Sequence, residues 1–146
     1  MEQRDYILRE IEKIELILRA IRQNILGGQD RLAINIEKQV DDAKGMLLNE
    51  LNFDIDKFLL LNIEESNEYL SNFEGFNIDN IEQLSECISQ IGFSNKSELS
   101  KKYLEKALQL YELINLKSKT YSFERERNIM KILSSSIIIT LLVLFA

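Results

Sequence analysis

The chain has 146 residues, of which 45% are apolar and 29% charged, so it is long enough for one globular domain with a buried core. Histidine, proline and tryptophan are absent, and cysteine occurs once. Without histidine there is no imidazole base and no histidine metal ligand, and a lone cysteine forms neither an intrachain disulfide nor a Cys-x-x-Cys site. The composition therefore predicts a protein with no catalytic residues, no metal and no cofactor, which is not an enzyme.

The net charge of −6 is unevenly distributed along the chain. Residues 49–99 hold 2 basic and 11 acidic side chains, whereas residues 100–146 hold 8 basic and 4 acidic ones. Proteins that wrap nucleic acid need a basic footprint, so the acidic middle predicts that nucleic acid is not a partner. The polar N-terminus carries no secretory signal and the single cysteine fits a reducing compartment, so we expect a cytoplasmic location.

Two long amphipathic helices are predicted at the start of the chain. In the first, over residues 3–26, isoleucine and leucine recur at spacings of three and four residues, which indicates one buried side. The second runs from about 30 to 51, with Gly27-Gly28 ending the first helix and Asp30 capping the second. Such a short connection predicts an antiparallel hairpin over residues 3–51.

The acidic middle is predicted to hold two short helices, at about 56–72 and 79–91, closed near Gly75 and by Gly92. An aromatic residue followed by Asx side chains precedes each of them, in Phe53-Asp54-Ile55-Asp56 and Phe76-Asn77-Ile78-Asp79. Asp79 and Glu82 are spaced as a capping box. We interpret Asp54 and Asp56 as helix caps rather than cation ligands, because the glycine-containing loop of a calcium site is missing.

A long helix is predicted over residues 95–117, opened by a capping box in Asn95-Lys96-Ser97-Glu98. The pattern weakens over 117–122, where Ser122 either restarts a helix or marks a kink. Cys87 is expected in the core, because free cysteine is often buried and its acidic neighbours disfavour a reactive thiolate. Glu64 and Glu65 point in different directions on a helix, which argues against an acid–base pair.

Two segments resemble known families. Residues 3–12, Gln-Arg-Asp-Tyr-Ile-Leu-Arg-Glu-Ile-Glu, resemble the opening of a family of small, functionally uncharacterised bacterial proteins. Residues 103–111, Tyr-Leu-Glu-Lys-Ala-Leu-Gln-Leu-Tyr, resemble the second helix of a tetratricopeptide hairpin. Aligned on Ala107, this resemblance places Leu84, Cys87, Ile88 and Ile91 inward on the first helix of the hairpin, although Ile88 stands where the repeat usually has a small residue. It implies protein partners and no catalytic residue.

The last 15 residues, 132–146, carry no charge and follow Arg125, Arg127 and Lys131. An apolar run of this length suits a helix buried in the domain or against a second subunit. A marginal membrane anchor with its basic flank in the cytoplasm and an irregular terminus are the alternatives.

We therefore expect an all-α fold of about five to six helices in antiparallel, tetratricopeptide-like hairpins. It would comprise one domain over residues 1–131, with the N-terminal hairpin 3–51, acidic middle helices over 56–91 and the long helix 95–117, followed by the apolar tail 132–146. The function expected is that of a non-catalytic protein-interaction module with an unidentified protein partner or self-association. Exposed tyrosines in a groove would mark its site, with Tyr103, Tyr111 and Tyr121 as candidates, but we favour the interpretation of these three as ordinary core or rim residues. The alternatives are a small protein held at the membrane by the tail and, less favoured, an enzyme.

Overall fold

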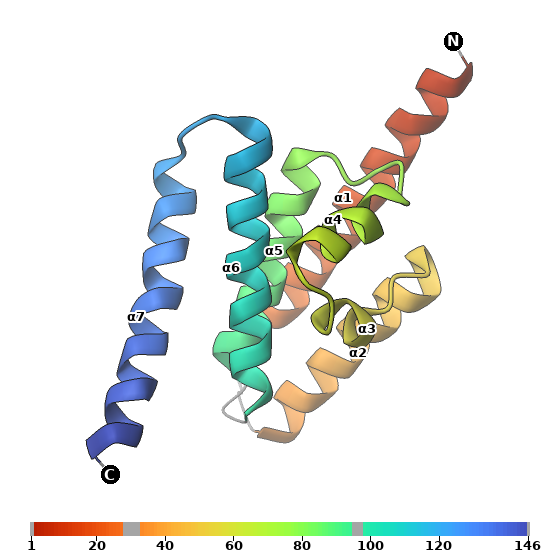
Figure 1. Ribbon diagram of the computed structural model, residues 1–146. Coiled ribbons are helices and arrows are strands. Elements are labelled where there is room, and N and C mark those ends of the chain that lie inside the picture. Colours follow the sequence, from red (N-terminus) through yellow and green to blue (C-terminus); the bar gives the residue numbers. More distant parts are fainter. Residues whose placement is uncertain (1, 28–32, 95–97, 146) are drawn as a thin grey trace.

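The computed structural model describes the backbone of residues 2–27, 33–94 and 98–145, and their side chains except at 26–27, 33–35, 136–143 and 145. Over these residues it is all-α, as predicted, with seven helices and no strand (Figure 1). The helices are α1 (Glu2–Gly27), α2 (Ala33–Leu51), α3 (Ile55–Leu59), α4 (Ile63–Ser71), α5 (Ile78–Ser94), α6 (Leu99–Ser118) and α7 (Phe123–Phe145). The expected number of five to six helices is therefore too low.

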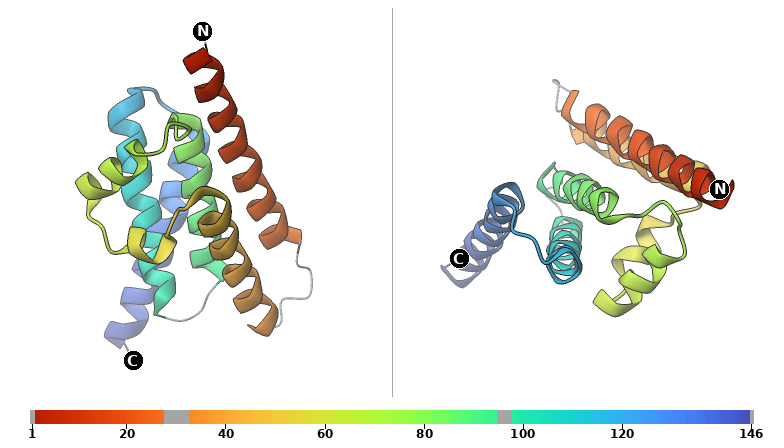
Figure 2. Two further views of the ribbon diagram at one scale, coloured as in Figure 1. Left: turned by 90° about the vertical axis from the view of Figure 1, so that its right-hand side faces the viewer. Right: turned by 90° about the horizontal axis from the view of Figure 1, so that it is seen from above.

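The helices pack in a chain of neighbours rather than around one centre. α2 contacts α1, α1 contacts α5, α5 contacts α6 and α6 contacts α7, while α3 and α4 lie against α6 (Figures 1 and 2). The start of α1 and the end of α7 lie at opposite ends of the molecule. α7 is therefore an edge helix, and α6 is its main support.

The α1 periodicity is confirmed. Ile14, Leu18, Ile21 and Ile25 are each at most 5% exposed, and they face α5 and α2. Burial of each isoleucine or leucine is worth roughly 1.5–3 kcal/mol, which fixes the side of the helix that packs inward. α1 ends at Gly27 as predicted, whereas the expected cap at Asp30 lies outside the described residues.

The single helix predicted over residues 56–72 is wrong, because the chain breaks it into α3 and α4. Asn62 caps α4 in a capping box with Glu65: its side chain accepts the Glu65 N–H at 2.8 Å, and the Glu65 carboxylate accepts the Asn62 N–H at 3.1 Å. The Leu61 carbonyl, which would otherwise continue a helix, accepts a hydrogen bond of 2.6 Å from Lys106 on α6. The break thus follows from one local cap and one distant lysine.

The start of α5 also differs from the prediction. Asn77, not Asp79, caps the helix by accepting the Asn80 N–H at 2.9 Å, and Glu82 binds Arg125 of α7 instead of completing a capping box. At its other end α5 continues past Gly92 to Ser94. A Cβ at Gly92 would lie 2.8 Å from Leu104 Cδ2, so this glycine lets α5 and α6 approach closely and does not end the helix.

Gly75 lies where the turn between α4 and α5 approaches α1 closely. The helix predicted to close near it ends at Ser71, and Gly75 lies in the turn that follows. A Cβ there would lie 2.5 Å from the Glu10 carbonyl oxygen. Asn80 secures this contact because its side-chain amide donates to the carbonyls of Ile11 at 3.0 Å and Gly75 at 2.8 Å.

α6 and α7 form the last antiparallel pair. The capping box expected at 95–98 falls largely on 95–97, outside the described residues, and α6 begins at Leu99. It ends where Lys119 takes a left-handed conformation, with φ of 54°. The Ser122 hydroxyl then caps α7 by accepting the Arg125 N–H at 3.2 Å. Of the two alternatives predicted for Ser122, a new helix or a kink, the structure therefore has the new helix. α7 runs without a break across position 132 to Phe145, so the apolar tail continues a helix.

Candidate interaction surface

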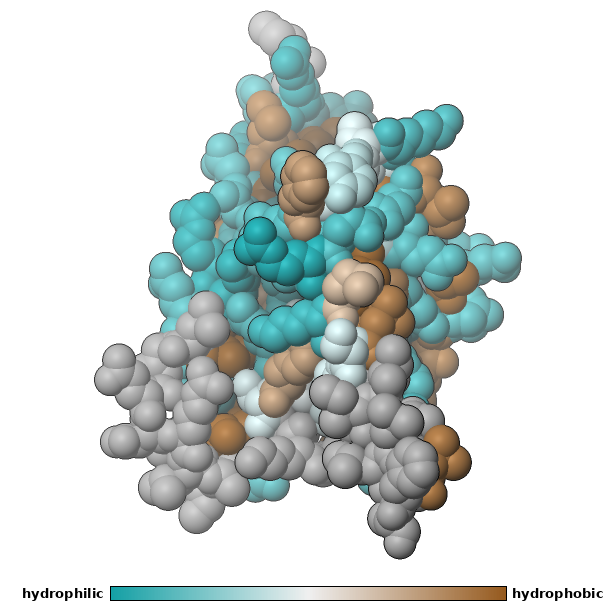
Figure 3. Space-filling view, turned by 90° about the vertical axis from the view of Figure 1, so that its left-hand side faces the viewer, coloured by the Kyte–Doolittle hydropathy of each residue, from teal (hydrophilic) through white to brown (hydrophobic). Residues whose placement is uncertain are grey.

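The outer face of α7 presents large apolar side chains to solvent. Phe123 is 78% exposed, Met130 59% and Leu144 71%, and we call these three residues the α7 stripe. They are separated by 7 and 14 positions, so they lie on one side of the helix. Figure 3, which views the molecule from the α7 side, shows apolar surface interspersed with hydrophilic surface on this face.

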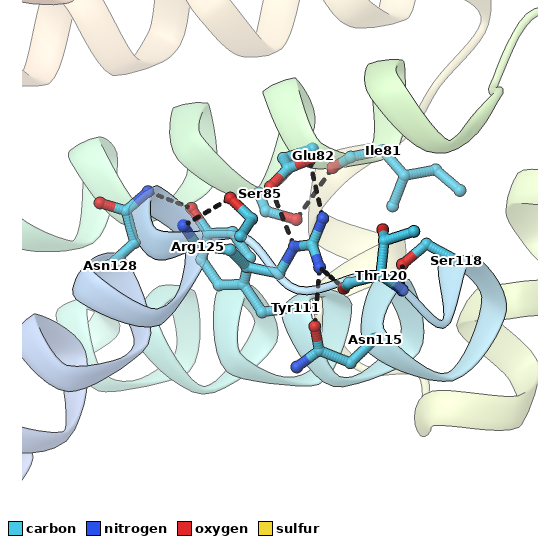
Figure 4. A network of polar contacts seen from close by, with 10 residues as sticks. Ile81, Glu82, Ser85, Tyr111, Asn115, Ser118, Thr120, Arg125 and Asn128 are labelled. Atoms are coloured by element: carbon cyan, nitrogen blue, oxygen red, sulfur yellow. Dashed lines mark hydrogen bonds and ion pairs between the residues drawn. The ribbon is translucent and has the colours of Figure 1, made fainter.

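The opposite face of α7 is fixed to the domain by one buried arginine. Arg125 is 4% exposed and reaches three parts of the fold (Figure 4). Its Nε and Nη2 donate to the two carboxylate oxygens of Glu82 on α5, at 3.0 and 3.3 Å. Its Nη1 donates to Asn115 Oδ1 on α6 at 2.9 Å and to the Thr120 carbonyl at 3.0 Å. This forked pairing is the geometry that a guanidinium provides and an ammonium does not.

A second polar contact supports the helix one turn further on. Asn128 donates from its side-chain amide to the Tyr111 hydroxyl at 3.3 Å. Tyr111 is fully buried, and burial raises the pKa of its phenol. Ile132, 1% exposed, adds an apolar contact on the same side of α7. Arg125, Asn128 and Ile132 therefore orient α7 so that the α7 stripe faces outward.

An acidic groove lies beside this network. It has a volume of about 440 Å³ and is bounded by α1, α5 and the start of α7. Its acidic lining residues are Glu15, Asp79, Glu82, Glu86 and Glu124. Arg22 from α1 pairs with Glu86 at 3.1 Å, and burial raises the pKa of the Glu86 carboxyl. Among the described residues, no group of three or more acidic or cysteine side chains is placed to hold a metal ion.

The core contains a buried lysine. Lys106 is 2% exposed, and its Nζ donates to the Leu61 carbonyl, to Ser66 Oγ at 2.7 Å and to Gln109 Oε1 at 2.9 Å. The ammonium also lies 4.9 Å from the centre of the Phe58 ring. Burial lowers its pKa to about 8, and the attraction of Glu65 only partly opposes that shift. Lys106 thus joins α6 to the α3–α4 turn.

We expect this lysine to make stability rise with pH in an alkaline window. Between about pH 8 and 10.5 the folded chain has lost the Lys106 proton while the unfolded chain still binds it, so deprotonation favours the folded state. In urea titrations, the free energy of unfolding of the wild type relative to Lys106→Met should increase by about 2 kcal/mol from pH 7.5 to 10. Comparing the two proteins at each pH cancels the opposite contribution of Cys87. A difference that stays constant or falls would contradict the assignment.

The cysteine and the acidic residues considered in the sequence analysis lie in separate parts of the fold. Cys87 is 3% exposed, its thiol donates to the Leu18 carbonyl at 3.5 Å, and burial raises its pKa to about 12, so its predicted place in the core is confirmed. Asp54 caps α3 by accepting the Lys57 N–H at 3.2 Å, as expected. Asp56 instead pairs with Lys44 at 3.0 Å. Glu64 and Glu65 are both exposed at the start of α4.

The three candidate tyrosines do not form a groove. Tyr103 and Tyr111 are 2% and 0% exposed, so both lie in the core, as the favoured interpretation predicts, and neither is available at an exposed site. Tyr121, 68% exposed, packs edge-on against Phe123 at a centroid distance of 5.0 Å. It therefore extends the α7 stripe towards the α6–α7 turn.

The inward positions implied by the tetratricopeptide resemblance are confirmed. Leu84, Cys87, Ile88 and Ile91 are at most 3% exposed, and Ala107 on α6 is fully buried. α5 and α6 pack against each other along their length (Figure 1). The hairpin is therefore present, although membership of the repeat family stays a prediction.

Comparison with protein-family models, curated proteins and solved structures finds no match to this chain. In the part of the chain that the structure describes, no helix is both long and apolar enough to cross a membrane.

Proposed function

We propose that this protein is a non-catalytic protein-interaction module whose contact surface is the α7 stripe. The observation that carries the proposal is the exposure of Phe123, Met130 and Leu144 on an edge helix whose other face is buried at Arg125 and Ile132. Exposed apolar side chains that share one side of an edge helix favour a binding surface more than single ones scattered over the molecule do. Aromatic residues and methionine are also enriched at protein interfaces, and the stripe and Tyr121 supply both.

The resemblance of α5 and α6 to a tetratricopeptide hairpin supports the same proposal. Such hairpins serve as protein-binding scaffolds, and here the hairpin provides the rigid base on which α7 lies. The absence of histidine from the sequence and the burial of Cys87 favour contact over catalysis. A cytoplasmic location fits a chain whose one thiol is buried and unpaired.

Photocrosslinking in cells tests the proposal directly. A photoreactive amino acid replaces Met130 in one variant and Leu16 in the control, because the two side chains have nearly equal exposure, 59% and 60%, on different helices. We expect crosslinked protein adducts from position 130 and only background from position 16. Equal labelling from both positions would overturn the α7 stripe as the binding surface.

Membrane association is the second candidate, and one observation favours it. Residues 132–146 are uncharged, Leu144 is exposed, and Arg127 and Lys131 are exposed on the preceding turns of α7. Basic side chains beside an apolar helix suit an anionic bilayer surface. Flotation of the intact protein with vesicles of phosphatidylcholine and phosphatidylglycerol tests this candidate. Recovery of all protein in the bottom fraction would exclude it.

A further inference from the structure

We draw no further inference here: the strongest candidate, a specific occupant for the unpartnered apolar face of α7 that Phe123, Met130 and Leu144 form, carries nothing because nothing in the structure shows what covers that face.

Discussion

Arg125→Met should lower the free energy of unfolding by about 3–5 kcal/mol, the cost of breaking a buried ion pair. Methionine keeps most of the apolar stem of Arg125 but removes every donor. Glu82, Asn115 Oδ1 and the Thr120 carbonyl then lose hydrogen bonds of 2.9–3.3 Å at the junction of α5, α6 and α7. Urea denaturation measures the loss. Amide hydrogen exchange should show its largest increase in residues 119–135, because this contact holds α7 in place.

Arg127→Met is the matched control for this prediction. Arg127 is exposed two positions away on the same helix, and replacing it should change stability by no more than about 0.5 kcal/mol. The double variant Glu82→Met/Arg125→Met should be less destabilised than the sum of the two single changes, since two apolar side chains leave no buried charge without its partner. Equal effects of Arg125→Met and Arg127→Met would contradict the role of Arg125 as the anchor of α7.

The sequence predicts the long helices well because their stability depends on local periodicity. The α1 stripe repeats over many turns, and Ile14, Leu18, Ile21 and Ile25 are buried as that repeat requires. Caps that act within three residues, such as Asp54, were also predictable. Helical periodicity and local caps depend on residues of a single helix, so they can be predicted without knowing how the other helices pack.

The errors arise where a distant residue decides the local structure. The break between α3 and α4 depends partly on Lys106, which is 45 positions from Leu61. The capping box expected from Asp79 and Glu82 fails because Asn77 caps α5 two residues earlier, and the Glu82 carboxylate binds Arg125, 43 positions away. A signal for Lys106 was present, since it lies three positions after Tyr103 and four before Leu110, on the apolar side of its helix. Two of its three acceptors could not be inferred, because Leu61 lies in the α3–α4 turn and Ser66 on α4, far from Lys106 in the sequence.

The α7 stripe was only partly predictable from the sequence. The uncharged run of 132–146 is evident in the sequence, but its three possible interpretations differ only in what lies beside it. The structure adds that the run continues one helix from Phe123 and that Arg125 and Ile132 turn its other face inward. Which residues stay exposed therefore depends on the α5–α6–α7 junction and not on hydropathy alone.

Phe53→Ala should also cost about 3–5 kcal/mol of unfolding free energy, the usual range for deleting a buried phenylalanine ring. Phe53 is fully buried, and its ring centre lies 5.0 Å from that of Phe58, 5.2 Å from Tyr69, 5.6 Å from Phe73 and 5.7 Å from Phe76. These rings come from α3, α4 and the turns that flank them. Alanine would leave a cavity that four neighbours share, and the short α3 and α4 have few other contacts to hold them.

Phe123→Ala provides a matched comparison, because the same side chain is removed from a site that is 78% exposed. At low protein concentration this change should alter the free energy of unfolding by no more than about 0.5 kcal/mol. It should nevertheless reduce the crosslinking of position 130 to a partner, since Phe123 belongs to the α7 stripe. Urea denaturation and photocrosslinking from position 130 in both variants separate the two roles: Phe53 acts on folding and Phe123 on partner contact. Equal destabilisation by the two substitutions would mean that Phe123 is buried in solution and that α7 carries no free apolar face.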